Sequence, residues 1–260
     1  MQLNRIYVEN CIETMTRMPD EFIDMTLTSP PYDDLRRYNG YEFELEAIVD
    51  LLFQKTREGG VVVWVVSDRT NGGESLTSFR HAIAFADRGF VLHDTMIYAK
   101  NNPIPSDCGR RYVQTFEYMF CFSKGTPKTF NPIRRPVRSD KAFRSFRITK
   151  GGRNDLGASR SAPDMRKAKN IFFYNVGTAS ASDKLAFEHP AIFPERLAED
   201  QIATWSNEGD LVYDCFLGSG TTARSAILLN REWIGSEISA EYADIAQQRL
   251  GQITNSGATI

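Results

Sequence analysis

The pattern of hydrophobic and polar positions alternates between short apolar runs and longer amphipathic stretches. Residues 61–66, with the sequence VVVWVV, are all apolar, which is typical of a strand buried on both faces of a parallel sheet. In residues 43–57, apolar side chains recur at helical spacing, and Gly59 and Gly60 follow as a stop signal. The two patterns therefore predict a helix followed by a central strand.

The same two patterns predict the other regular elements. Strands are expected at residues 5–8, 22–27, 61–66, 90–99, 116–123, 211–213 and 233–238. Helices are expected at residues 11–18, 43–57, 78–88, 194–205, 221–229 and 240–250. Strands that alternate with helices predict an α/β fold with an open, mostly parallel, twisted sheet.

The middle of the chain has a different character. Residues 134–169 have weak helical or strand periodicity, and they carry 12 Lys and Arg against three Asp, for a net charge of +9. The rest of the chain therefore carries −11, because the whole carries −2. We expect an inserted, irregular lobe whose charge suits phosphates, although an isolated charge run is usually a solvated surface.

Composition limits the class of protein. The 260 residues are 42% hydrophobic and 25% charged, which excludes collagen-like, coiled-coil and wholly disordered chains. The four cysteines form no CxxC pair and there are only three histidines, so we expect no metal site and a reducing compartment. The N-terminus lacks the apolar core of a signal peptide. These features predict a cytoplasmic protein with no membrane segment.

A glycine-rich turn, DCFLGSGTT, occupies residues 214–222 between a predicted strand and a predicted helix. Glycines let the backbone approach a ligand closely, and a helix N-terminus offers unpaired amides. About 20 residues further on, the next strand ends at Glu237, whose carboxylate suits the hydroxyls of a ribose. No lysine follows Gly220 and GxGxxG is absent, so the turn predicts a nucleoside without a polyphosphate. The alternative is a tight strand–helix turn with no ligand.

The sequence TSPPY, residues 28–32, follows the strand predicted at residues 22–27. Open α/β sheets place their sites at this carboxyl edge. A bare PPY would ordinarily indicate a stiff loop, but it occurs here together with the glycine turn and Glu237. Together these segments resemble the amino-methyltransferases of DNA, whose catalytic motif is (D/N/S)PPY and whose cofactor motif is DPFxGSGTT. Cys215 replaces the proline of the second motif.

The resemblance covers residues 5–250 and includes HPAIFPERL at residues 189–197. The motif order is that of the β group, a circular permutation of the S-adenosylmethionine-dependent methyltransferase fold. This implies a catalytic half at residues 1–125, an inserted DNA-recognition lobe at 126–175 and a cofactor half at 176–260. It also implies that the strand before Glu9 neighbours the strand that ends at Glu237.

The resemblance assigns the site residues. The catalytic loop comprises Ser29, Pro30, Pro31 and Tyr32. The cofactor S-adenosylmethionine is expected at Asp214, Phe216, Gly218, Ser219, Gly220, Thr221 and Glu237, with His189 and Pro190 at its methionine end. DNA contacts are expected from Arg134, Arg135, Arg138, Lys141, Arg144 and Arg147. Such enzymes rotate the target base out of the duplex, and Tyr32 would stack on it.

The resemblance implies a site-specific DNA methyltransferase that acts on an exocyclic base amino group. Ser29 before the prolines favours cytosine N4, and adenine N6 is the alternative. A catalytically inactive nucleic-acid-binding relative and an RNA substrate are further alternatives. Double-stranded DNA is the expected partner, and a homodimer and a separate restriction endonuclease are partners that the resemblance allows.

Overall fold

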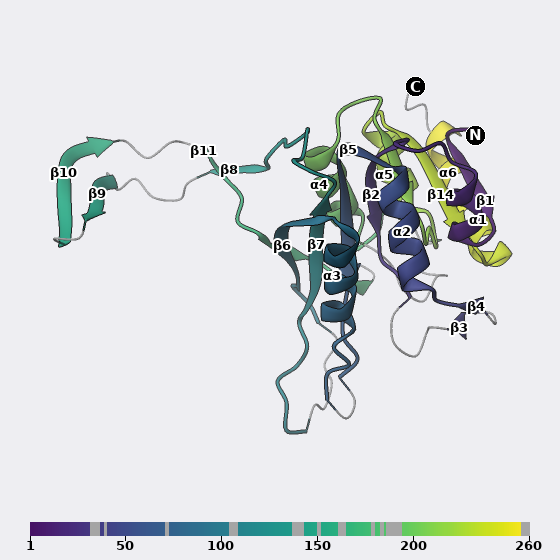
Figure 1. Cartoon of the computed structure of the whole chain (residues 1–260), viewed down its shortest axis with the longest axis horizontal. Helices are drawn as coiled ribbons and strands as arrows, with labels where there is room; N and C mark the ends of the chain where they lie inside the picture. Colours follow the sequence, from purple (N-terminus) through teal and green to yellow (C-terminus); the bar gives the residue numbers. More distant parts are fainter. Residues whose placement is uncertain are drawn as a thin grey trace. The chain divides into compact units, whose positions relative to one another are not determined.

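An eight-stranded sheet runs through the larger part of the chain (Figure 1). The computed structural model describes residues 1–31, 37–38, 41–70, 73–103, 109–136, 143–149, 152–160, 165–177, 180–182, 185 and 194–255. The strand order is β1 (Arg5–Val8), β14 (Glu232–Glu237), β13 (Leu211–Asp214), β2 (Ile23–Thr28), β5 (Thr56–Val66), β7 (Phe116–Ser123), β6 (Val91–Lys100) and β12 (Ile171–Tyr174). Neighbouring strands are parallel except where β7 pairs with β5 and β6. The predicted mostly parallel α/β fold is confirmed.

Within the described residues, six helices cover the sheet in two layers (Figure 1). One layer contains α1 (Cys11–Thr16), α2 (Leu45–Lys55) and α3 (Thr77–Arg88), and the other contains α4 (Glu195–Trp205), α5 (Thr221–Leu228) and α6 (Ala240–Asn255). The side chains of β5 alternate between the layers. Val62, Trp64 and Val66 pack into a core with Leu52 and Phe85 of the first layer. The central strand is therefore buried on both faces, as its apolar run predicts.

The strand β1 pairs with β14 in parallel, with Val8 opposite Glu237. The segment before Glu9 and the segment that ends at Glu237 are thus neighbours, as the permuted motif order implies. Next to them, β13 pairs with β2. This second pairing brings the end of the TSPPY strand beside the start of the glycine turn.

Two elements of the eight-stranded sheet differ from the sequence prediction. The strand β5 begins at Thr56 rather than at Val61, because Gly59 and Gly60 form an irregular stretch of strand instead of a helix stop. Gly59 has φ of +79°, and a Cβ there would lie 2.4 Å from Cγ of Lys128. The edge strand β12 was not predicted. It pairs with β6, with Phe172 and Tyr174 buried on one face.

A second compact unit comprises Pro132–Lys169, and the rest of the chain forms the first. It contains the antiparallel pairs β8 (Arg134–Pro136) with β11 (Met165–Lys167), and β9 (Phe143–Thr149) with β10 (Gly152–Arg160). The weak periodicity did not predict these strands. The unit holds all 12 basic residues of the basic segment, so its net charge is +9.

A two-stranded pair, β3 (Arg37–Tyr38) with β4 (Tyr41–Glu42), completes the described strands. Among the described helices, none is both long enough and apolar enough to cross a bilayer.

Candidate active site

The predicted catalytic loop begins where β2 ends. Thr28 is the last residue of the strand and is buried, Ser29 is half-buried and Pro30 is buried. Consecutive prolines fix φ and remove two backbone donors. The loop therefore presents the Ser29 hydroxyl and the Pro30 carbonyl from a backbone of restricted freedom. Tyr32, predicted to stack on the target base, lies outside the described residues.

The second loop, residues 214–220, joins β13 to α5 and is called the cofactor loop below. Gly218 and Gly220 have φ of +53° and +82°, a region that glycine adopts at no steric cost. A Cβ on Gly220 would lie 3.0 Å from Cβ of Ala246 in α6. Backbone conformation and the close approach of α6 both require glycine at this position.

A hydrogen bond connects the two loops. The hydroxyl of Thr28 donates to Oδ1 of Asp214 at 2.6 Å, between two buried side chains. The amide of Phe216 donates to the same oxygen at 3.0 Å. Burial raises the pKa of Asp214, and hydrogen bonds from Thr222 and Thr28 lower it in part. The bond holds the predicted catalytic and cofactor segments side by side, although 186 positions separate the two residues.

Glu237 ends β14 beside the same loop. Its Oε2 accepts the amide of Gly218 and its Oε1 accepts the amide of Ser239, both at 2.8 Å. Burial raises the pKa of this carboxyl, and the two amides act in the opposite direction. A carboxylate has about four acceptor positions, so each oxygen keeps capacity for a ligand hydroxyl. Gly235, in the same strand, leaves room for Leu217, whose side chain a Cβ would meet at 2.6 Å.

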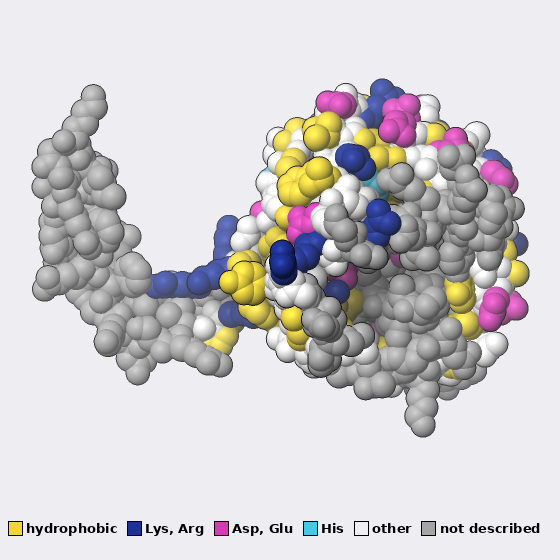
Figure 2. Space-filling view, turned by 90° about the horizontal axis from the view of Figure 1, so that it is seen from below, with side chains coloured by type: hydrophobic (Ala, Val, Ile, Leu, Met, Phe, Trp, Pro, Cys, Tyr) yellow, Lys and Arg dark blue, Asp and Glu magenta, His cyan; other side chains and the backbone are white. Residues whose placement is uncertain are grey.

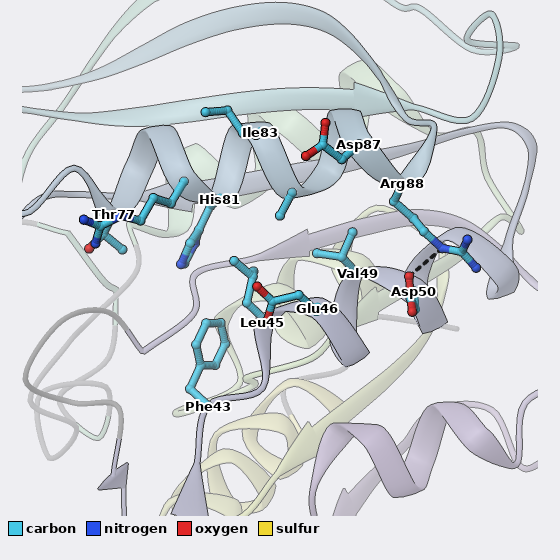
Figure 3. Close-up of a pocket in the computed structure, with 12 residues that line it drawn as sticks. Phe43, Leu45, Glu46, Val49, Asp50, Thr77, His81, Ile83, Asp87 and Arg88 are labelled. Carbon is cyan, nitrogen blue, oxygen red and sulfur yellow. Dashed lines mark ion pairs between the residues drawn. The ribbon is translucent and has the colours of Figure 1, made fainter.

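Aromatic side chains pack against Phe216 of the cofactor loop. Its ring centroid lies 5.8 Å from that of Phe43 and 6.2 Å from that of Trp64. The indole of Trp64 donates to Nδ1 of His81 at 3.0 Å. Phe43 and His81 also line a cavity of about 670 Å³ between α2 and α3 (Figure 3). Apart from Phe43, the residues that line this cavity belong to α2 and α3. Neither Ser29 nor any residue of the cofactor loop lines it.

Sequence reasoning missed two residues that organise the site, Thr28 and Arg249. The guanidinium of Arg249, in α6, donates to the carbonyl of Ser219 at 2.5 Å. An arginine in an amphipathic helix ordinarily faces solvent, so no sequence signal indicated it. For Thr28, its place immediately before Ser29 could have served as a signal.

The other predicted residues fall in three groups. Ser219 and Thr221 are buried at the start of α5. Arg134 and Arg135 are exposed in β8, and Arg144 and Arg147 lie in β9. Figure 2 shows several Lys and Arg side chains on the described part of this unit. Outside the described residues lie Tyr32, Arg138, Lys141, His189 and Pro190.

Comparison with known families identifies the chain. The family model described as DNA methylase matches residues 23–248, which include both loops and Glu237. This chain belongs to the DNA methylase family. The recognition made from the TSPPY and glycine-turn motifs is confirmed.

Named relatives of this DNA methylase include the orphan methyltransferase M.BamHII of Bacillus amyloliquefaciens, which is 51% identical over 237 residues, or 88% of each chain. Among solved structures, the cytosine-N4-specific PvuII DNA methyltransferase has a TM-score of 0.67 and 23% identity, over 96% of this chain and 90% of that one. The complex of M1.HpyAVI with S-adenosylmethionine has a TM-score of 0.65 and 24% identity, over 95% of this chain and 98% of that one. The two structures share the fold of this chain.

In this DNA methylase, Cys215 replaces the family's proline and lies in the hydrophobic core. Burial raises the pKa of its thiol well above the usual value. The group is therefore a neutral thiol, which suits a packing role beside the cofactor loop and not the role of a nucleophile.

Proposed function

We propose that this DNA methylase transfers a methyl group from S-adenosylmethionine to the N4 amino group of a cytosine in duplex DNA. The observation that carries the proposal is the hydrogen bond from Thr28 to Asp214. It sets an acceptor-rich loop with two prolines beside a glycine-rich loop of the family's cofactor type. A base amino group and a methyl donor would therefore meet at one edge of the sheet.

The residues of the cofactor loop fit S-adenosylmethionine. Gly218 and Gly220 have no side chain, so a ligand can approach their backbone closely. The first amides of a helix such as α5 have no hydrogen-bond partners within the helix. Glu237 keeps acceptor capacity for the ribose hydroxyls. When bound, S-adenosylmethionine supplies an electrophilic methyl group on a sulfonium. The solved complex of M1.HpyAVI with the same cofactor supports this choice.

The catalytic loop would act on the base amino group. The lone pair of that nitrogen is conjugated into the ring, so the amino group is a weak nucleophile. If its two hydrogens are donated to the Ser29 hydroxyl and the Pro30 carbonyl, the nitrogen is drawn towards tetrahedral geometry. The two acceptors are fixed in advance by the prolines. In direct transfer the nitrogen would form a bond to the methyl carbon as the bond from that carbon to sulfur breaks, S-adenosylhomocysteine would leave, and the nitrogen would lose one proton to solvent. This needs no covalent intermediate with the protein, and positioning supplies much of the rate.

Cytosine N4 is proposed because a neutral serine stands before the two prolines. The PvuII enzyme, which is cytosine-N4-specific and shares the fold over nearly the whole chain, supports this choice. Unit Pro132–Lys169 is proposed as the DNA-recognition lobe, because its charge of +9 suits phosphate contacts. A homodimer and a partner endonuclease stay predictions.

Nucleoside mass spectrometry of DNA from cells that express the protein tests the proposal. We expect N4-methylcytosine in cells with the wild-type protein and much less of it in cells with Ser29→Ala. N6-methyladenine without N4-methylcytosine would reassign the base and leave the loop mechanism in place. No methylated base in either DNA or RNA, with folded protein present, would support the inactive binding relative instead.

A further inference from the structure

The most deeply buried charge near the cofactor loop belongs to Arg249, whose side chain has an exposed fraction of 0%. One nitrogen, Nη1, donates to the carbonyl of Ser219 at 2.5 Å, to Oγ of Ser219 at 3.1 Å and to Oγ1 of Thr221 at 3.2 Å. The arginine thus contacts both the last turn of the cofactor loop and the first residue of α5. These contacts connect α6 to the cofactor loop.

The other nitrogen, Nη2, donates to Oε1 of Glu195 at 3.1 Å. Glu195 is the first residue of α4 and is also buried. Its Oε2 accepts the amide of Ser182 at 2.9 Å. Nε of Arg224 in α5 lies 3.5 Å from Oε1, the oxygen that also accepts from Arg249. Three helices, α4, α5 and α6, therefore converge on one carboxylate.

Ala246 lies three positions before Arg249 and so occupies the same face of α6. Its small side chain permits the close approach of Gly220 described above. One face of α6 therefore contacts Ser219, Gly220 and Thr221. The helix supports the stretch of backbone where a ligand would lie.

Removing a guanidinium from water costs more free energy than a buried ion pair usually returns, so such a pair is weak evidence for stability. Apolar residues of similar volume would fill the space at least as well. The contacts of Arg249 instead fix one backbone carbonyl and two hydroxyls, all within three residues of the cofactor loop and helix start. Because all these contacts go to the cofactor loop and the start of α5, we infer that Arg249 fixes the conformation of this backbone.

We propose that Arg249 is a positioning residue for cofactor binding, which holds Ser219, Gly220 and Thr221 in the conformation that receives S-adenosylmethionine, with Glu195 as its counter-ion. The proposal rests on the function proposed above for the cofactor loop. Arg249 does not touch the cofactor itself. It acts through the loop, so its loss changes cofactor affinity and leaves the catalytic loop and the DNA contacts intact.

The test uses the full chain with S-adenosylhomocysteine, the product of the cofactor, as the probe in isothermal titration calorimetry. We expect Arg249→Met to raise the Kd about tenfold or more, because three hydrogen bonds from a charged donor are lost. The kcat at saturating S-adenosylmethionine and the KM for DNA should stay within about twofold of the wild type, because positioning of the base is unaffected. Glu195 keeps Arg224 and Ser182 in this variant.

Arg231→Met is the matched control. Arg231 also bridges elements, because it donates to Oγ of Ser206 at 3.0 Å and to the Ser206 carbonyl at 2.7 Å. It precedes the amino end of β14, whereas the cofactor loop follows the carboxyl end of the neighbouring parallel strand β13. Its loss should lower the Tm and leave the Kd for the probe unchanged.

Arg249→Lys provides a second test of the same Kd if the methionine variant fails to fold. A single ammonium on a flexible chain lacks the planar fork that serves both Ser219 and Glu195, so we expect a Kd raised about threefold or more. A wild-type Kd in either folded Arg249 variant, or an equal rise in Arg231→Met, would overturn the proposal. A wild-type protein that neither binds the probe nor methylates nucleic acid would instead overturn the proposed function.

Discussion

The two compact units of this DNA methylase differ in where their charge lies and in how it is held. The first unit carries a net charge of −11, and the charged residues proposed for its site, Asp214, Glu237 and Arg249, are buried and hydrogen-bonded. The second carries +9, and Arg134 and Arg135 are exposed on β8. Buried, fixed groups suit a reaction that depends on geometry, whereas exposed cations suit a salt-sensitive attraction to phosphates. We expect substitutions in the first unit to change cofactor binding or turnover, and substitutions in the second to change DNA affinity alone.

The largest effect is expected from Ser29→Ala. Loss of one of the two acceptors for the base amino group should lower kcat by about 100-fold, the scale seen when one preorganised hydrogen-bonding group is removed from a transition state. Single-turnover incorporation of a tritiated methyl group measures the change. The Kd for S-adenosylhomocysteine serves as the control and should not change. A variant with wild-type kcat would remove Ser29 from the mechanism.

Gly220→Ala should raise the Kd for S-adenosylhomocysteine about tenfold, because the new Cβ meets Ala246 and the residue has positive φ. Gly209→Ala is the matched control. Gly209 has the same φ of +82°, and a Cβ there meets nothing within 4 Å. Both variants should lose stability, and only the first should lose cofactor affinity, measured by calorimetry. Equal affinities in the two variants would contradict a role for the contact with α6.

The double variant Arg134→Gln, Arg135→Gln tests the other unit. The slope of log K for DNA against log salt concentration should become shallower by about 1.8, because two phosphate contacts are lost at about 0.9 each. Cofactor Kd should stay at the wild-type value. Arg88→Gln removes a surface cation of α3 that pairs with Asp50 of α2 (Figure 3), and it should leave the slope unchanged. Fluorescence anisotropy over a salt series measures all three proteins.

The pH dependence of cofactor affinity is expected to be a smaller effect. Burial raises the pKa of Glu237 above its ordinary 4.5, so the carboxylate that would accept ribose hydroxyls is protonated at a higher pH than an exposed glutamate. Affinity for S-adenosylhomocysteine should fall as pH decreases through that raised pKa, and Glu237→Gln should flatten the profile. An unchanged profile in the variant would exclude Glu237 as the source.

The same group affects stability with the opposite sign. Between the unfolded pKa and the raised folded pKa, the folded state binds more protons, so stability falls as pH rises through this window. Urea unfolding of wild type and Glu237→Gln should therefore show the difference in unfolding free energy shifting in favour of the variant as pH rises.

Much of the sheet follows from the sequence, since the all-apolar run of β5 and the amphipathic pattern of α2 are strong signals. Gly59 and Gly60 were wrongly predicted to end a helix, because glycines also mark irregular strand where another chain segment approaches closely. The strand β12 is only four residues long and half exposed, which gives too little pattern to detect.

The candidate site also has features that the sequence predicts and features that it does not. Motifs such as SPPY and GSGTT are local and can be recognised, whereas the bond from Thr28 to Asp214 and the burial of Arg249 depend on contacts between distant parts of the chain. A helical arginine has the same sequence signature whether it faces solvent or a carboxylate. Only the packing of α6 against α4 and α5 distinguishes the two.

The hydrogen bond from Thr28 to Asp214 also has a thermodynamic consequence. If one ligand shifts its loop, the shared bond transmits part of that change to the other, and the coupling free energy must be equal in both directions. The factor by which S-adenosylmethionine changes DNA affinity therefore equals the factor by which DNA changes cofactor affinity. Thr28→Val, which keeps the shape and removes the donor, should bring both factors towards one, measured as four Kd values around the cycle.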